Sequence, residues 1–163
     1  MYFEEICLKH GILVRAYSFH NHSTKSKNRL ILTREDLLKG YDSVKRAAKQ
    51  LKRSMPCETY ILNLILRNYH QLNNSNHVYA IGTIDGLHVD GGTGWAVQMA
   101  ISKGLKVFVF DQDKHDWFTW YNNEWRVIEK PQTPDKFFTG IGTRQLEQNG
   151  RRAIENLIAS FKK

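Results

Sequence analysis

A glycine-rich turn between two apolar runs constrains the fold more than any other feature of this sequence. "HVYAIG" (77–82) precedes the turn, "GGTG" occupies 91–94, and "KVFVFD" (106–111) follows. Short, almost wholly apolar runs are typical of strands that helices cover on both faces, and 94–102 reads as a helix. A strand, a helix and a strand in this order predict a βαβ unit. We therefore expect an α/β fold, a Rossmann-like three-layer sandwich with a mainly parallel sheet.

The segments around this unit supply the other expected elements. Apolar residues recur at helical spacing in four segments, and two further segments are rich in branched or aromatic residues. In "FTWYNNEWRVIE" aromatic residues alternate on either side of Asn122 and Asn123, which predicts a small aromatic β-hairpin. We expect helices over 2–10, 33–51, 57–72 and 143–161, strands over 12–18 and 136–142, and a polar loop over 19–28.

Length and composition limit the classes of protein. A chain of 163 residues is too short for two ordinary domains, so we expect a single domain over 1–163. No apolar run approaches the roughly 20 residues of a membrane span, and the first residues lack the pattern of a secretory signal. We therefore expect a soluble, cytoplasmic protein without membrane contacts, in which Cys7 and Cys57 are buried thiols rather than a disulfide.

The charge of the chain favours anionic partners. Lys and Arg number 24 against 16 Asp and Glu, which gives a net charge of +8. Such an excess attracts phosphates, nucleotides or nucleic acid, without choosing among them. Several of these cations, between Lys45 and Arg53, have the spacing of a solvated helix face, so a structural role is the competing interpretation.

The glycine turn itself predicts an anion-binding loop. Small residues between a strand and a helix let backbone amides approach an anion, and the helix N-terminus adds partial positive charge. Here Gly91, Gly92, Thr93 and Gly94 offer their amides, and Thr93 adds a hydroxyl. The alternative is a tight turn without a ligand. The spacing matches neither the dinucleotide-binding fingerprint nor the Walker loop, which would need a lysine.

Polar residues near the expected strand ends are further candidates. His20 and His22 follow the first strand and could bond a phosphate or a ribose, although two histidines without a third ligand make a weak metal site, and we expect no metal. Asp111 directly follows the central apolar run, where a carboxylate can accept hydrogen bonds from ribose hydroxyls. Asp113 and Asp116 fit a solvated loop equally well.

Aromatic residues and a second glycine turn are the remaining candidates for ligand contacts that residue chemistry suggests. Trp95, next to the glycine loop, and Trp117 could stack on a nucleobase, whereas the other two tryptophans fit a cover for the core. "GIGTR" repeats the strand, glycine and threonine pattern. It suggests Gly142, Thr143 and Arg144 as phosphate contacts, with the arginine in the first turn of a helix.

Four segments together resemble a known superfamily. They are "VYAIG", "VDGGTGWAVQMAISKGLKVFVFDQD", the aromatic stretch 117–125 and "FTGIGTRQLEQNGRRAI". They are similar to small phage and bacterial proteins of the SLOG superfamily, the Rossmann-like group that includes the LOG (lysine-decarboxylase-like) phosphoribohydrolases and nucleotide-sensor domains. The resemblance covers most of the chain and implies nucleotide binding. It also adds Arg67 and Asn68, near the end of the preceding helix, to the candidates.

Two departures from the superfamily pattern modify this expectation. The LOG loop carries a catalytic glutamate, and its alignment on Gly91 and Gly92 places Asp90 at a proline and Gln98 at that glutamate. An amide cannot act as a general base, so we expect no LOG-type hydrolysis and have no confident catalytic residue. The resemblance also implies an additional first strand with its glycine loop. Its absence here would leave a sheet edge that a second copy could cover, so we expect a homo-oligomer.

These observations lead to one functional expectation with two alternatives. We expect a protein that binds, and sequesters, a nucleotide-derived molecule such as an ADP-ribose-type or cyclic nucleotide signal. Among phage relatives such binding fits an anti-defence role, and no cofactor is implied. The first alternative is a nucleotide N-glycosidase that uses Asp90 or Asp111 in place of the missing glutamate. The second alternative is nucleic-acid binding through the basic helices.

Overall fold

A five-stranded sheet forms the centre of the protein, which we describe from a computed structural model covering residues 2–22 and 26–161. The strand order is β8-β7-β6-β3-β9. The strands are β3 (His77–Gly82), β6 (Lys106–Asp111), β7 (Asp116–Tyr121), β8 (Glu124–Ile128) and β9 (Phe138–Ile141). β3 lies parallel to β6 and to β9. β7 is antiparallel to β6, and β8 is antiparallel to β7. The expected α/β class is confirmed, with a mixed rather than a mainly parallel sheet.

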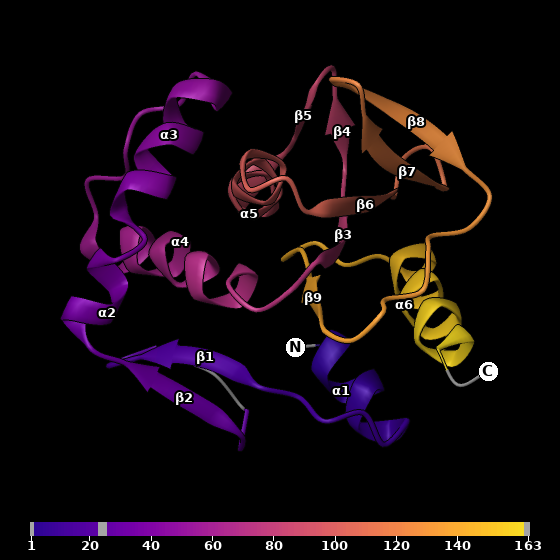
Figure 1. Cartoon of the computed structure of the whole chain (residues 1–163), viewed down its shortest axis with the longest axis horizontal. Coiled ribbons are helices and arrows are strands. Elements are labelled where there is room, and N and C mark those ends of the chain that lie inside the picture. The colour runs from indigo at the N-terminus through magenta and orange to yellow at the C-terminus, as the bar shows by residue number, and fades with distance from the viewer. Residues whose placement is uncertain (1, 23–25, 162–163) are drawn as a thin grey trace.

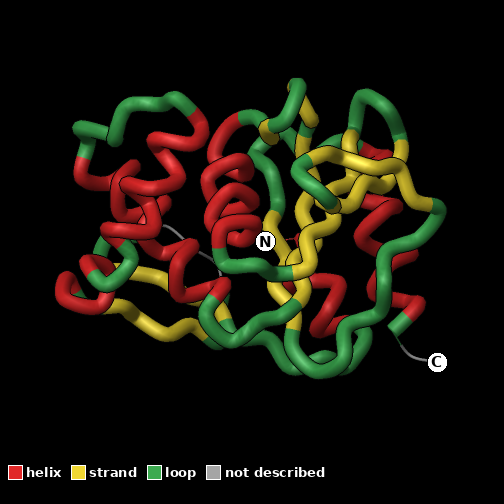
Figure 2. The backbone as a smooth tube through the Cα atoms, turned by 45° about the horizontal axis from the view of Figure 1, so that its top comes forward, coloured by secondary structure: helices red, strands yellow, loops and turns green. Residues whose placement is uncertain are grey.

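Helices pack on both faces of this sheet, as a Rossmann-like sandwich requires. On β3, Val78 and Ala80 belong to one buried cluster and Tyr79 and Ile81 to the other, because successive side chains point to opposite faces. Figures 1 and 2 show the resulting layers, with α1 and α6 on one side of the strands. The helices are α1 (Tyr2–Lys9), α2 (Arg34–Leu38), α3 (Tyr41–Leu51), α4 (Thr59–Leu72), α5 (Gly91–Ser102) and α6 (Gln148–Ser160).

The expected βαβ unit is present as β3, α5 and β6. α5 is apolar around most of its circumference, and its residues from Thr93 to Ala100 are all buried. A helix of this kind needs cover on every side. It lies between the sheet and the pair α3 and α4, and Figure 1 shows it nearly end-on at the centre. The glycine turn therefore sits at the start of the most enclosed helix of the described chain.

The N-terminal part differs from the sequence prediction. β1 (Ala16–Phe19) pairs in parallel with β2 (Arg29–Leu32), and these two strands form a sheet separate from the central one. β2 was not predicted. Half of the surface of Leu30 and Ile31 is exposed, with 51% for each, so the strand lacks the buried pattern that identifies strands in a sequence. The predicted loop over 19–28 includes Phe19, which ends β1, and residues 23–25, which lie outside the described residues.

The expected helix over 33–51 is divided in two at Gly40. Thr33 caps α2 as predicted, because its hydroxyl accepts from the Asp36 amide while the Asp36 carboxylate accepts from the Thr33 amide. Gly40 lies against α4, where a Cβ atom would come within 2.8 Å of the Tyr69 Cβ. The chain bends at this close approach, and a new helix begins at Tyr41.

β7 and β8 extend the central sheet instead of standing apart from it. They pair with Trp120 opposite Trp125, and both residues of the connecting turn have left-handed backbones, with φ of 50° at Asn122 and 60° at Asn123. Two such residues are typical of a type I′ turn, whose twist matches that of the strands. A further short pair, β4 (Ile84–Asp85) and β5 (His88–Val89), connects β3 to α5.

The last helix begins later than predicted. We expected Thr143 to open it, but α6 begins at Gln148 with Glu147 as its N-cap. The Gln112 side chain accepts from the Glu147 amide at 2.9 Å and donates to the Gln145 carbonyl at 3.0 Å. These two bonds fix 143–147 as an extended loop along the end of the sheet. Arg144 therefore lies before the helix rather than in its first turn.

Two further expectations concern the thiols and the membrane. Cys7 is buried as expected, but Cys57 is exposed, so the expectation is wrong for the second thiol. Neither forms a disulfide.

Across residues 2–22 and 26–161, the helices are too short or too polar to cross a bilayer.

Candidate functional site

A cavity of about 380 Å³ opens beside the carboxyl ends of β3, β6 and β9, where α/β sheets bind ligands. We call it the rim cavity. One wall comes from the segment between β3 and α5, and it consists of Gly82, Thr83, Asp90 and Gly91. The opposite wall comes from the ends of β6 and β9, and it consists of Gln112, Asp113, Thr143, Gln145 and Glu147.

The start of α5 leaves backbone donors free, and of the residues that carry them Gly91 lines this cavity. Asp90 is the N-cap of α5, but its side chain makes no capping bond. The first intrahelical bond runs from the Gly94 amide to the Asp90 carbonyl, so the amides of Gly91, Gly92 and Thr93 have no acceptor within the described residues. Gly91 has a left-handed backbone with φ of 62°, which favours glycine at this position.

The two threonines that were expected to contact a ligand differ in their surroundings. Thr93 is buried, and its hydroxyl donates to the Gly142 carbonyl at 3.2 Å, so it joins the two glycine turns instead of facing the cavity. Thr143 lines the rim cavity. Gly142 therefore contributes a carbonyl to the internal structure, while the residue after it stays available to a ligand.

The charge of the rim cavity is opposite to that of the whole chain. Asp90, Asp113 and Glu147 supply carboxylates, and no Lys or Arg lines the cavity among the described residues. Arg53 contacts the glycine loop without lining the cavity, since it donates to the Gly91 carbonyl at 2.9 Å and to the Val89 carbonyl at 3.3 Å. Arg144 is exposed but does not line the cavity.

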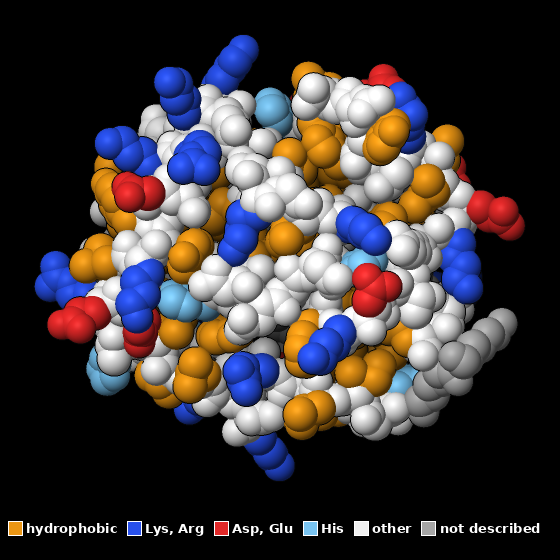
Figure 3. All heavy atoms as spheres, in the orientation of Figure 1, with side chains coloured by type: hydrophobic (Ala, Val, Ile, Leu, Met, Phe, Trp, Pro, Cys, Tyr) orange, Lys and Arg blue, Asp and Glu red, His pale blue; other side chains and the backbone are white. Residues whose placement is uncertain are grey.

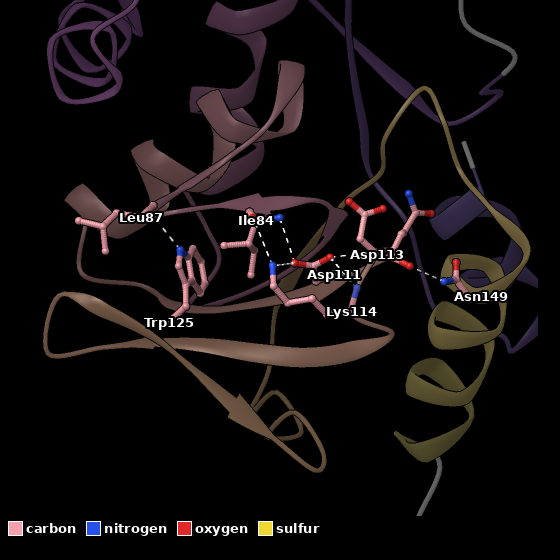
Figure 4. A network of polar contacts seen from close by, with 8 residues as sticks. Ile84, Leu87, Asp111, Asp113, Lys114, Trp125 and Asn149 are labelled. Carbon is pink, nitrogen blue, oxygen red and sulfur yellow. Dashed lines mark hydrogen bonds and ion pairs between the residues drawn. The ribbon is translucent and has the colours of Figure 1, made fainter.

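Asp111 is a structural residue, which corrects its expected role as a ribose ligand. It is fully buried and accepts from the amides of Ile84, Asp113 and Lys114 and from the Lys114 ammonium at 2.6 Å (Figure 4). Burial raises the pKa of its carboxyl, but the bonds from Lys114 and the three amides outweigh burial and hold the pKa below its ordinary value. Its oxygens are therefore occupied, and it cannot act as the carboxylate of a glycosidase.

The predicted aromatic contacts are also corrected. Trp95 is only 6% exposed and packs in the core around α5, so its ring cannot reach a ligand in the rim cavity. Trp117 lines a separate groove of about 500 Å³, which lies between β6, β7 and α6 and which we call the aromatic groove. Gln98, at the position of the LOG glutamate, donates from its side-chain amide to the side-chain oxygen Oε1 of Gln50 at 3.2 Å and thus faces α3.

The remaining candidates lie away from the rim cavity. His22 contacts Arg67 and Ser18, while His20 is exposed and Asn68 is buried on α4. None of them lines the rim cavity. Within the described part of the chain, no group of three His, Cys, Asp or Glu residues has a geometry that could hold a metal ion.

Sequence reasoning missed five residues of the rim cavity, namely Gly82, Thr83, Gln112, Gln145 and Glu147. Thr83 and Gln112 directly follow the ends of β3 and β6, so the rule that ligands bind beyond the carboxyl ends of strands could have identified them. Gln145 and Glu147 had no such signal, because the segment was assigned to a helix.

The basic residues lie outside the rim cavity. The exposed cations of α3 and its C-cap are Lys45, Arg46, Lys49 and Lys52. Figure 3 shows Lys and Arg side chains densest over the region of α3, at the upper left, and scattered elsewhere on that face. This arrangement is typical of a solvated helix face. Nucleic-acid binding through the basic helices stays an untested alternative.

Comparison with known protein families, curated proteins and solved structures gives no match to this chain. Membership of the SLOG superfamily therefore stays a prediction from the sequence segments.

Proposed function

We propose that the rim cavity binds a nucleotide-derived ligand rich in sugar hydroxyls, of the ADP-ribose type. The observation that carries this proposal is that the free amide of Gly91 and the carboxylates of Asp90, Asp113 and Glu147 line one cavity. Free amides bind phosphate oxygens, and carboxylates accept hydrogen bonds from ribose hydroxyls. A ligand with both kinds of group uses both walls.

The charge of the cavity narrows the ligand class. A triphosphate would place about four negative charges beside Asp90, Asp113 and Glu147 without a lining cation. An ADP-ribose-type molecule carries fewer charges and several hydroxyls that can donate to those carboxylates. We therefore expect binding to decrease as the number of phosphates rises and to increase with the number of free hydroxyls.

Calorimetry tests this proposal with ADP-ribose, a cyclic dinucleotide and ATP. We expect heat with ADP-ribose and at least tenfold weaker binding of ATP. Chromatography of the same mixtures should return the ligand intact, as sequestration requires. Absence of heat with every phosphorylated nucleoside contradicts the proposal.

Removing the carboxylate charges should weaken binding without unfolding the protein. Asp90→Asn and Glu147→Gln keep the shape of the cavity, and both side chains are exposed. Each loses charge-assisted hydrogen bonds from hydroxyls, so we expect about tenfold weaker binding of ADP-ribose per substitution. Glu5→Gln, an exposed carboxylate on α1, is the matched control. Equal affinity of all three variants would place the ligand elsewhere.

The same carboxylates favour one alternative, a nucleotide N-glycosidase. Cleavage of a glycosidic bond uses a pair of carboxylates, and the described structure leaves Asp90, Asp113 and Glu147 for this role because Asp111 is enclosed. Free base released during incubation with a nucleotide, and its loss in Asp90→Asn, would support catalysis over sequestration.

The wider role and the oligomeric state are further proposals. The four segments that resemble the SLOG superfamily support a nucleotide ligand, and sequestration of a host signal by a phage protein follows from that resemblance alone. β9 pairs on one side only, with β3, so a second copy could extend the sheet there. Light scattering during size-exclusion chromatography distinguishes a homo-oligomer from a monomer.

A further inference from the structure

Arg67 on α4 is a largely enclosed cation without a counter-charge. Its Nη1 atom donates to His22 Nε2 at 3.1 Å, and it forms no ion pair in the described structure. All 16 Asp and Glu residues of the chain lie within the described ranges, so none of them is an unseen partner. Burial lowers the pKa of this guanidinium, because an enclosed site disfavours the charged form.

One edge of the guanidinium has no hydrogen-bond acceptor. Nε is enclosed and has no partner, and no bond joins Nη2 to any described residue. Nε and Nη2 together form the fork with which arginine binds two oxygens of one anion. A buried donor without an acceptor is unfavourable, so such a group requires an explanation, and a bound ion or water is the usual one.

His22 cannot neutralise this cation. Arginine only donates, so His22 Nε2 must accept and Nδ1 carries the proton, which it donates to the Ser18 hydroxyl at 3.0 Å. Ser18 is 1% exposed, and the His22 ring stacks on Phe19 with 4.9 Å between centroids. Burial, followed by the charges of Arg67 and Arg29, lowers the pKa of His22. The imidazole is therefore neutral, and its Nε2 atom holds Nη1 of the guanidinium in place.

We propose that the Nε and Nη2 fork of Arg67, oriented by His22, binds a phosphate-type oxyanion. Nη1 is already engaged, so the free fork presents two parallel donors to two oxygens of the anion. Nη2 keeps contact with solvent, since it is not among the enclosed atoms without a partner, and it offers the point of entry. A small opening of the side chains around Nε accompanies binding. This site is separate from the rim cavity and does not depend on its proposed ligand.

Thermal unfolding in sodium phosphate and in sodium chloride of equal ionic strength tests the site. With phosphate at ten times its dissociation constant, we expect the Tm of the unaltered protein to rise by about 4 °C. Arg67→Met should show no phosphate-dependent rise. In chloride its Tm should exceed that of the unaltered protein, because an uncompensated buried charge has been replaced by an apolar chain of similar length.

Three controls decide the interpretation. Arg46→Met removes an exposed helical arginine and should keep the full phosphate effect. Arg67→Lys keeps the charge but lacks the fork, so a smaller phosphate effect is expected, and this variant serves if Arg67→Met does not fold. Sodium acetate should stabilise less than phosphate. The proposal fails if phosphate has no effect, if acetate has the larger effect, or if Arg67→Met responds to phosphate as the unaltered protein does.

Discussion

Gly94→Ala is expected to destabilise the protein by about 3 kcal/mol, close to the upper range for overpacking. A Cβ atom at this position would overlap the Val89 carbonyl, which is backbone and cannot rotate away. Arg53 also lies 3.3 Å from the same point. The start of α5 would have to move away from β5, and the whole glycine loop would move with it. Urea denaturation monitored by circular dichroism measures the loss.

Gly92→Ala is the matched control for this substitution. It lies in the same turn of α5, but nothing is within 4 Å of its Cβ position and its backbone is not left-handed. We expect unchanged or slightly higher stability, because alanine reduces the freedom of the unfolded chain. Equal losses in both variants would mean that the Val89 contact does not determine the effect at Gly94, because alanine favours a helix more than glycine does.

Asp111→Ala should cost about 3 kcal/mol, because it leaves three buried or half-buried amides and the Lys114 ammonium without their acceptor. Those amides fix the turn after β6 and the start of β4. Asp113→Ala changes a neighbouring exposed carboxylate and should be close to neutral. A small loss at Asp111 would show that the network of Figure 4 contributes little to stability.

The same carboxylate predicts a dependence of stability on pH. Its pKa in the folded protein lies below the ordinary value of 3.8, so its ionised form stabilises the fold. This contribution is complete above the unfolded pKa and is lost as the pH falls through the folded pKa. Below about pH 4 the stability of the unaltered protein should therefore fall more steeply than that of Asp111→Asn. If the stability of the unaltered protein and that of Asp111→Asn fall in parallel with pH, the lowered pKa of Asp111 is contradicted.

The parts of the fold that follow from local pattern could be predicted from the sequence. The runs 77–82 and 106–111 are almost wholly apolar, and they form β3 and β6 with the helix between them. The strand Arg29–Leu32 was missed because it is mostly exposed. The start of α6 was misplaced because Gln112 holds the Glu147 amide across 35 residues, a tertiary contact without a local signal.

The candidate site was predicted in position more accurately than in detail. The glycine turn lies beside a cavity at the strand ends, as expected. Asp111 has the predicted place after β6, but the turn that follows uses its oxygens. Trp95 was expected at the ligand, and it is buried because α5 has neighbours on every side. A sequence shows which residues are near a strand end but not which atoms are already bonded.

The contacts of Gln112 connect the rim cavity to a residue of the aromatic groove. The side chain of Gln112 fixes the loop of the rim cavity, and its carbonyl accepts at 2.7 Å from Asn149, which lines the aromatic groove. A molecule that shifts this residue from either side displaces a boundary of the other compartment. Thermodynamic linkage then requires each occupant to alter the affinity of the second by the same factor.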